Sequence, residues 1–262
     1  MTNDIESAYR AIAEDPKYQH FAMIPDRIIR CVEYFRIKCD RVDAKDRLLA
    51  YYLFIGVVDH AIDSGDLELG SLVLKRFTWP RCFDDSTRVS PAVLMTEILK
   101  TQIEDKSYRR ILQNLRALYQ QVVRERMVTS IESYIDQRRS VGRLTAKLSY
   151  LLICPLLEGE HKELGEFMEQ IGEIGCLIDS VIDLNSDGRL GLLSFKPTRG
   201  DFVRLVLCTL RDGAALSLRY PRLFGLFVQS INDNIQDLFR RTPSASEHQV
   251  VSQRKDVATS VA

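Results

Sequence analysis

The chain has 262 residues, of which 45% are hydrophobic, so it can bury a substantial core as one large domain or two small ones. Its 36 Lys and Arg residues balance 36 Asp and Glu residues. This balance excludes a global basic field for nucleic acid or for an anionic membrane, so any recognition of phosphate must be local. The six cysteines are scattered without a C-x-x-C pair, which predicts reduced thiols rather than a disulfide framework or a zinc site.

The ends and the apolar runs of the chain bear on its location. The first 20 residues lack the apolar core of a signal peptide. The longest apolar run, Leu151 to Leu157, contains Pro155 and is too short to span a bilayer. We therefore expect a cytoplasmic protein without a transmembrane segment, while peripheral contact with a membrane and a homodimer stay open.

Apolar residues recur with the period of a helix along almost the whole chain, and no strand-like alternation competes, so we expect an all-α fold. The predicted helices span residues 4–14, 26–38, 43–65, 90–104, 107–126, 129–154, 160–186, 199–218 and 220–241. Ser90 before Pro91 is typical of a helix N-cap, and Asp43 with Asp46 resembles an acidic helix start.

No linker or repeat divides this pattern, so residues 1–241 are predicted to form a single domain. Residues 242–262 are polar and aperiodic, which predicts a disordered tail. Residues 81–88 form a polar connection, and we interpret their pair Asp84 and Asp85 as part of a loop or cap rather than a metal site.

Two sets of aspartates lie on apolar helical stretches. They are Asp59 with Asp63, and Asp179 with Asp183 and Asp187. Residues four apart share one face of a helix, roughly 6 Å apart, so each set forms a row of carboxylates. Magnesium prefers such hard oxygen donors and commonly binds through one or two carboxylates together with substrate phosphates. Because carboxylates near a buried stripe are costly unless paired or metal-bound, two such sets favour a shared site for magnesium and diphosphate over surface acids.

Two groups of basic side chains could bind the phosphates. Candidate donors of paired hydrogen bonds to phosphate are Arg138, Arg139 and Arg143, and candidates to close over it are Arg189 and Lys196. The alternative for the arginines is a solvated helix face with ion pairs to Glu125 or Asp136.

A carbocation formed from an allylic diphosphate must be kept from water. Aromatic residues available to line such a cavity are Tyr51, Phe54, Tyr134, Tyr150 and Phe167, although aromatics at helical spacing more often form ordinary core. His60 could accept a proton, but its place between two ligands favours an outward or supporting role.

Two stretches resemble the aspartate regions of the squalene/phytoene synthases. In DAKDRLLAYYLFIGVVDHAID the residues in register are Tyr52, Phe54, Val57, Val58, Asp59 and Asp63. In IGEIGCLIDSVIDLNSDGR, Asp183 and Asp187 match, and Asp179 stands where that family usually has Asn. The resemblance implies a class I terpenoid synthase bundle, an isoprenoid-synthase-like domain with its active-site cavity in the centre.

A third stretch, SIESYIDQRRSVGRLTAKL, resembles the phosphate-sensing segment of bacterial terpene cyclases. Its matching residues are Tyr134, Arg138, Arg139 and Gly142. The resemblance implies that an arginine senses the diphosphate and that the helix breaks near the glycine. The coupling enzymes carry Arg where this chain has Gly56 and a second Asp where it has His60, which favours cyclisation over coupling.

We therefore expect a Mg²⁺-dependent class I terpene synthase that ionises farnesyl or geranylgeranyl diphosphate and cyclises or rearranges the carbocation. The five aspartates would bind metal and act in catalysis with Arg138 and Arg139. The substrate-binding residues would be Tyr134, Gly142, Arg143, Arg189, Lys196, Tyr51 and Phe54. The alternatives are coupling of two prenyl diphosphates by a squalene/phytoene-type transferase and a non-catalytic helical protein that binds prenyl groups or serves assembly.

Overall fold

The structure is a computed structural model that describes residues 3–63, 67–78, 90–125, 127–159, 161–223 and 225. Within these ranges the chain forms nine α-helices, three short 3-10 turns and no strand, which confirms the predicted all-α class. The chain divides into two compact units, residues 1–213 and 214–262. Residues 81–88 and 242–262 lie outside the described residues, and the single domain over 1–241 stays a prediction.

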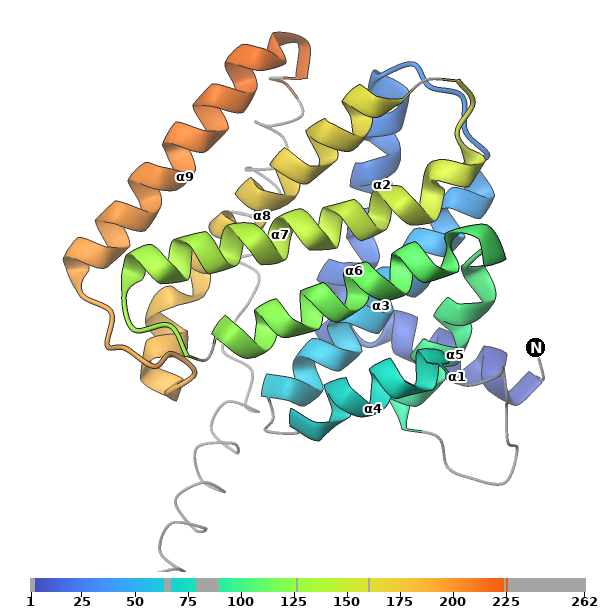
Figure 1. The fold of residues 1–262 in the computed structure, drawn as a ribbon, viewed down its shortest axis with the longest axis horizontal. Coiled ribbons are helices and arrows are strands. Elements are labelled where there is room, and N and C mark those ends of the chain that lie inside the picture. Colours follow the sequence, from blue (N-terminus) through green and yellow to red (C-terminus); the bar gives the residue numbers. More distant parts are fainter. Residues whose placement is uncertain are drawn as a thin grey trace, which may run out of the picture. The chain divides into compact units, whose positions relative to one another are not determined.

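Figure 1 shows the helices in chain order. They are α1 (Asn3–Glu14), α2 (Gln19–Tyr34), α3 (Arg41–Asp63), α4 (Leu67–Thr78), α5 (Pro91–Gln102), α6 (Asp105–Glu125), α7 (Ile131–Ile153), α8 (Lys162–Leu190) and α9 (Arg199–Arg219). The 3-10 turns are η1 (Pro16–Tyr18), η2 (Cys154–Leu156) and η3 (Pro221–Leu223). None of the described helices is long and apolar enough to cross a membrane.

Helix α3 forms the centre of the larger core. Tyr51, Tyr52, Leu53 and Phe54 are consecutive and all buried, so α3 is apolar around its circumference and is covered on several sides. The helices that pack on it include α2, α4, α5 and α7. Near its carboxyl-terminal end Asp59 is exposed, whereas Ala61 still packs against this core and Ile62 is buried.

A second apolar cluster joins α7, α8 and the first part of α9. Its buried residues include Tyr134 and Ile135 of α7, Leu177 and Leu184 of α8, and Leu205 of α9. This cluster packs α7, α8 and the first part of α9 against one another. It therefore fixes the helices on which most of the candidate site residues lie.

Helices α7 and α8 cross with their backbones in contact. A Cβ atom added to Gly142 would lie 2.2 Å from the carbonyl oxygen of Gly172, so only glycine fits this crossing. Helix α7 runs unbroken from Ile131 to Ile153. The helix break expected near Gly142 is therefore absent, because the glycine serves the close approach of two continuous helices.

The helix ends follow capping chemistry. The hydroxyl of Ser90 accepts a hydrogen bond from the Val93 amide, which confirms the predicted cap of α5. Helix α3 begins earlier than expected, because the Asp40 carboxylate accepts hydrogen bonds from the amides of Val42 and Asp43, both at 3.1 Å. A left-handed residue, Gly191 with φ of 71°, ends α8.

The observed helices differ from the predicted ones in several places. Helix α2 begins at Gln19 and includes Pro25, seven residues before the predicted start. Helix α8 continues to Leu190, so Asp187 and Arg189 lie within the helix. Helix α4 was not predicted. Of the predicted helix over residues 220–241, residues 220–223 form a bend and the turn η3, and most of the rest lies outside the described residues.

Candidate functional site

The second acidic set lies along one face of α8, as its spacing predicts. Asp183 and Asp187 are half-buried, whereas Asp179 is exposed. In the first set, Asp59 is exposed near the end of α3, and Asp63 is the last residue of that helix, with its side chain outside the described residues. The expected burial cost of the carboxylates was therefore wrong for Asp59 and Asp179, because both reach solvent.

One aspartate from each set affects the thiol of Cys176 on α8. Burial raises the pKa of the Cys176 thiol to about 12, and the nearby Arg138 guanidinium opposes that shift. The carboxylates of Asp179, Glu125 and Asp59 raise it further. Acidic side chains from α3, α6 and α8 thus act on one point, although the first set lies more than a hundred residues from Cys176 in the sequence.

Arg138 of α7 occupies the middle of this group. Its Nε donates to Ser180 Oγ at 2.8 Å, and its Nη1 donates to Glu125 Oε1 at 3.1 Å. Ser180 is 1% exposed and donates its own proton to the Cys176 carbonyl, which leaves its oxygen to accept from Arg138. Burial lowers the pKa of the guanidinium, but the acidic groups around it outweigh this effect and raise the pKa well above its usual value. Arg138 therefore stays charged.

Tyr134 lies one helical turn before Arg138 on α7 and borders the same group of side chains. It is 1% exposed, and burial raises its pKa to about 12. The Phe195 ring meets the Tyr134 ring edge to face, with 6.0 Å between centroids. A Cβ atom on Gly188 would lie 2.8 Å from Pro197 Cδ, so residues 191–198 fold back onto α8. This return brings Lys196, which is exposed, between two anchored neighbours.

The other predicted phosphate donors are engaged elsewhere. Arg139 donates from Nη2 and Nε to Asp212 Oδ2 at 2.6 and 3.0 Å, and from Nη1 to Asp136 at 3.2 Å. Arg143 donates from Nε to Glu173 at 2.6 Å. The ion pairs to Glu125 and Asp136 that the sequence left as an alternative are both formed, by Arg138 and Arg139 respectively.

Arg189 is exposed on the last turn of α8. Its Nε donates to the Asn185 carbonyl at 3.3 Å, a contact within its own helix. The structure thus places Arg189 and Lys196 at the same end of α8 as Asp187.

The aromatic residues proposed to line a cavity pack as core. Tyr51 is fully buried and donates to the Thr145 carbonyl at 3.2 Å, and Phe54 meets Phe77 edge to face. Phe167 packs against Phe35 with 5.4 Å between centroids. Their predicted contact with substrate remains a prediction.

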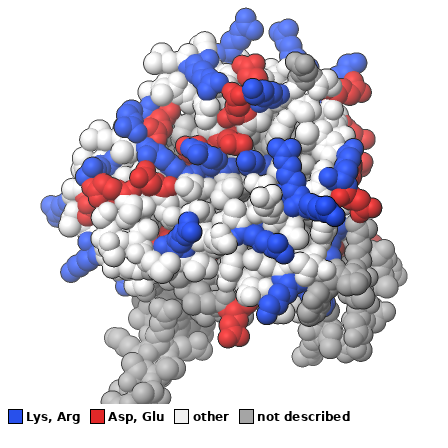
Figure 2. Space-filling model, viewed as in Figure 1, with Lys and Arg blue, Asp and Glu red and all other residues white. Residues whose placement is uncertain are grey.

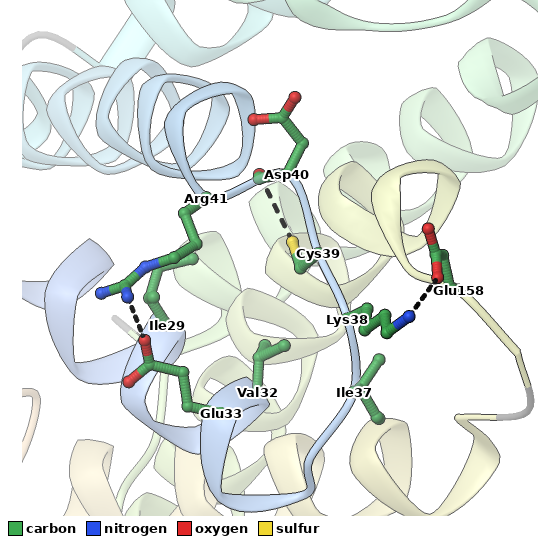
Figure 3. Close-up of a pocket in the computed structure, with 9 residues that line it drawn as sticks. All are labelled: Ile29, Val32, Glu33, Ile37, Lys38, Cys39, Asp40, Arg41 and Glu158. Atoms are coloured by element: carbon green, nitrogen blue, oxygen red, sulfur yellow. Dashed lines mark hydrogen bonds and ion pairs between the residues drawn. The ribbon is translucent and has the colours of Figure 1, made fainter.

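A pocket of about 560 Å³ lies elsewhere, between α2 and residues 37–41 (Figure 3). Ile29, Val32 and Ile37 form its apolar wall, and the ion pair of Glu33 with Arg41 borders it at 2.8 Å. None of the predicted site residues lines this pocket. It is therefore not the central cavity that the family resemblance implies.

The donor set can be tested against the expected magnesium. Within the described residues no three His, Cys, Asp or Glu side chains gather closely enough to hold a metal ion by themselves. Magnesium does not require three, because one or two carboxylates and the oxygens of a bound diphosphate complete its shell. The hard oxygens of Asp59, Asp179, Asp183 and Asp187 fit that mode, and the Asp63 side chain lies outside the described part.

Several residues of this group were missed from sequence. Glu125 is the last residue of α6 and was considered only as an ion-pair partner. Ser180 lies within the second acidic set, and Phe195 lies eight residues after Asp187, the last aspartate of that set. Of these residues only Ser180 could have been suspected from the sequence. It is a small polar residue directly after Asp179, and such a side chain can hydrogen-bond to an adjacent helix where two helices cross closely. The positions of Glu125 and Phe195 depend on tertiary packing.

No family model, no curated protein and no solved structure matches the chain. The functional argument therefore rests on the residues and their geometry.

Proposed function

We propose that the chain is a Mg²⁺-dependent class I isoprenoid synthase that ionises one prenyl diphosphate and cyclises or rearranges the resulting carbocation. The observation that carries the proposal is the row of Asp179, Asp183 and Asp187 on one face of α8, beside Arg138, whose Nε donates to Ser180 at 2.8 Å. The Asp59 carboxylate of α3 supports it, because it contributes to the raised pKa of Cys176 on the same helix. Carboxylates from two distant segments beside a half-buried cation provide both charges that a metal and diphosphate complex needs.

Each side chain has a role that follows from its place. Asp59, Asp179, Asp183 and Asp187 would hold magnesium, which supplies Lewis-acid neutralisation of the leaving diphosphate when bound. Arg138 would donate to the diphosphate through Nη2, which makes no hydrogen bond to the described residues. Glu125 and Ser180 hold the other guanidinium nitrogens, so the donor is oriented before the ligand arrives.

The apolar cluster beside Arg138 excludes water from one side of the proposed site. Tyr134, Leu177 and Leu184 are buried within the α7, α8 and α9 cluster. Lys196, on the segment that folds back onto α8, would approach the diphosphate from the exposed side. The reacting end of the prenyl chain would then lie toward α3, on the side of Asp59.

The direct test is incubation with prenyl diphosphates of ten, fifteen and twenty carbons in the presence of Mg²⁺. Organic extracts are analysed by mass spectrometry, and released diphosphate is counted. We expect a product that keeps the carbon number of its substrate, with one diphosphate released per product. A product with twice the carbon number and two diphosphates released would assign the coupling reaction instead.

The site is tested by Asp183→Ala and Asp59→Ala, with Asp105→Asn as the matched control on the exposed first turn of α6. We expect the first two variants to lose about a hundred-fold or more in turnover, because removing charge stabilisation in the transition state has effects of this order. The control should keep full activity. Near-normal turnover in Asp183→Ala and Asp59→Ala would overturn the site.

Binding of a prenyl diphosphate without chemistry is the second candidate. The observation in its favour is the closed ion pair of Arg139 with Asp212, which withholds one predicted phosphate donor. Saturable binding of the substrates without product over long incubation would assign this function.

A further inference from the structure

A cluster of three reactive side chains lies at the junction of α7 and α8, away from the aspartates. Cys154 begins η2, His161 precedes α8, and Tyr150 lies on the last turn of α7. The Tyr150 hydroxyl and His161 Nδ1 are 2.5 Å apart, and Cys154 Sγ lies 3.8 Å from His161 Nε2. A thiol and an imidazole are thus in contact while a third group holds the other ring nitrogen, which is the arrangement of an activated nucleophile.

One tautomer of His161 would make the ring a base for Cys154, and the Tyr150 hydroxyl can hold that tautomer. The Tyr150 hydroxyl also lies 3.5 Å from the carbonyl oxygen of His161, and that oxygen can only accept. If Tyr150 donates its proton to the carbonyl, its oxygen accepts from Nδ1–H of the ring. Nε2 then carries the lone pair and faces Cys154 Sγ, ready to accept the thiol proton.

Packing keeps this geometry in place. Gly165 of α8 leaves room for the Tyr150 ring, because a Cβ atom there would lie 3.1 Å from the ring carbons. Burial raises the pKa of Tyr150 to about 12, and the neighbouring Cys154 contributes to that shift, whereas Arg110 of α6 opposes it. Tyr150 therefore stays protonated at neutral pH and serves as a fixed partner. Cys154 and His161 are both half-exposed, so a small molecule can reach the thiol.

We propose that Cys154 and His161 form a nucleophilic dyad, positioned by Tyr150, that takes soft carbon electrophiles such as α,β-unsaturated carbonyl compounds. The thiol proton moves to His161 Nε2, and the sulfur forms a bond to the β-carbon of the electrophile. The electrons of the carbon–carbon double bond move toward the carbonyl as an enolate, and the imidazolium returns the proton to the α-carbon. Every atom of both reactants is kept in the adduct. This site is independent of the proposed synthase.

The chain offers an internal reference thiol. Cys39 is half-exposed like Cys154, but its Sγ contacts the Asp40 carbonyl at 3.4 Å instead of a base. Burial and the Asp40 carboxylate raise the pKa of Cys39. Burial also raises the pKa values of Cys31 and Cys176 to about 12, so these thiols are expected to react slowly.

The test is a time course with N-ethylmaleimide on the folded chain at pH 7, with each cysteine followed by peptide mapping and mass spectrometry. We expect Cys154 to react about ten-fold or more faster than Cys39, since the thiolate is the nucleophile. His161→Gln should reduce the Cys154 rate to that of Cys39. Equal rates for the two thiols in the wild-type chain, or a Cys154 rate unchanged in His161→Gln, would overturn the proposal.

Tyr150→Phe separates positioning from packing, because it keeps the ring against Gly165 and removes only the hydroxyl. In the wild-type chain the Cys154 rate should persist at pH values where the Cys39 rate has already fallen. The variant should shift the Cys154 profile toward that of Cys39. A profile unchanged in a variant that melts as the wild type does would remove Tyr150 from the dyad, and a wild-type profile identical to that of Cys39 would remove the dyad itself.

Discussion

Position 142 accommodates no residue other than glycine. A side chain there would meet the backbone of Gly172 at 2.2 Å, and backbone atoms cannot move aside as a flexible side chain can. The glycine sets the spacing of α7 and α8, and through it the distance from Arg138 to Ser180 and Cys176. The resemblance of the segment around Gly142 to the terpene-cyclase motif can therefore reflect helix packing.

We expect Gly142→Ala to lower the free energy of unfolding by about 1–3 kcal/mol or more, the usual effect of overpacking. Gly175→Ala is the matched control on α8, because a Cβ atom there meets nothing within 4 Å. The control should raise stability by about 0.5–1 kcal/mol through helix propensity. Urea denaturation of both variants measures the contrast. Equal effects would contradict the backbone contact.

Arg138 and Arg139 are adjacent in sequence but differ in what holds them. Arg138→Gln should lower turnover on a prenyl diphosphate by about a hundred-fold with a small change in KM, because its donors act mostly on the separating charge. Arg139→Gln should mainly lower thermal stability, since it breaks the pair with Asp212. Steady-state kinetics and melting curves on both variants check this. A kcat loss of similar size in Arg139→Gln would place both guanidinium groups on the diphosphate.

At the scale of elements, helix α4 shows where sequence reasoning stops. Gly70 in its first turn and the short span of Leu67–Thr78 gave no clear helical period. In the structure Gly70 lies against the Tyr119 ring of α6, and an added Cβ atom would lie 2.0 Å from it. Packing thus decides this helix, whereas long periodic helices such as α6 were predicted within two residues at each end.

The candidate site likewise has features that spacing predicts and features that depend on tertiary packing. Spacing alone correctly placed Asp179, Asp183 and Asp187 on one helix face, because that follows from helix geometry. It could not place the Phe195 contact with Tyr134 or the Glu125 contact with Arg138, since these depend on how separate helices meet. Spacing also did not indicate that Asp59 and Asp179 are exposed, because the apolar neighbours of each aspartate face other sides of its helix.

Helices α4 and α5 are joined by a buried ionic group. Lys100 Nζ lies 3.2 Å from Glu97 Oε2 and donates to the Arg76 carbonyl at 3.0 Å, and Lys100 and Glu97 are 1% and 2% exposed. Glu97→Ala should cost about 3–5 kcal/mol, because it removes the carboxylate that pairs with the buried Lys100 ammonium.

The double variant Glu97→Ala, Lys100→Met should recover most of that loss, since the buried ammonium is removed together with the carboxylate that it pairs with. Urea denaturation of the single and double variants measures the coupling. Additive losses would mean that the two charges do not depend on each other.

At the scale of the whole molecule, charges of both signs are interspersed on the face that carries α6 and α7, in keeping with the neutral composition (Figure 2). Stability should then depend on buried ionisable groups more than on net charge. Burial is the main cause that raises the pKa values of Tyr9, Tyr52 and Tyr134 to about 12.

An unfolded tyrosine releases its proton near pH 10, so above that pH the unfolded chain binds fewer protons than the folded chain and stability falls as pH rises toward 12. Denaturation at pH 8, 9, 10 and 11 should show the free energy of unfolding declining above about pH 10. Tyr9→Phe should reduce the slope. A slope that does not change in Tyr9→Phe would show that Tyr9 ionises alike in both states.

Ligand binding should also be visible in the stability of the whole fold. If the aspartates and Arg138 bind magnesium and diphosphate jointly, both ligands together should raise Tm by more than the sum of the separate shifts, because only the ternary complex satisfies every charge. Differential scanning fluorimetry with Mg²⁺, with inorganic diphosphate and with both measures this. Shifts that simply add would count against a shared site.

The return of residues 191–198 onto α8 has a consequence for timing. Phe195 is held against Tyr134, and Pro197 against Gly188, so the backbone on both sides of Lys196 is already ordered. Only the long side chain of Lys196 then has to change rotamer when an anion arrives or leaves. Such changes take picoseconds to nanoseconds, whereas reordering a whole segment takes up to microseconds. If the proposed diphosphate binds at this end of α8, we expect its exchange to be limited by diffusion and desolvation rather than by movement of the chain.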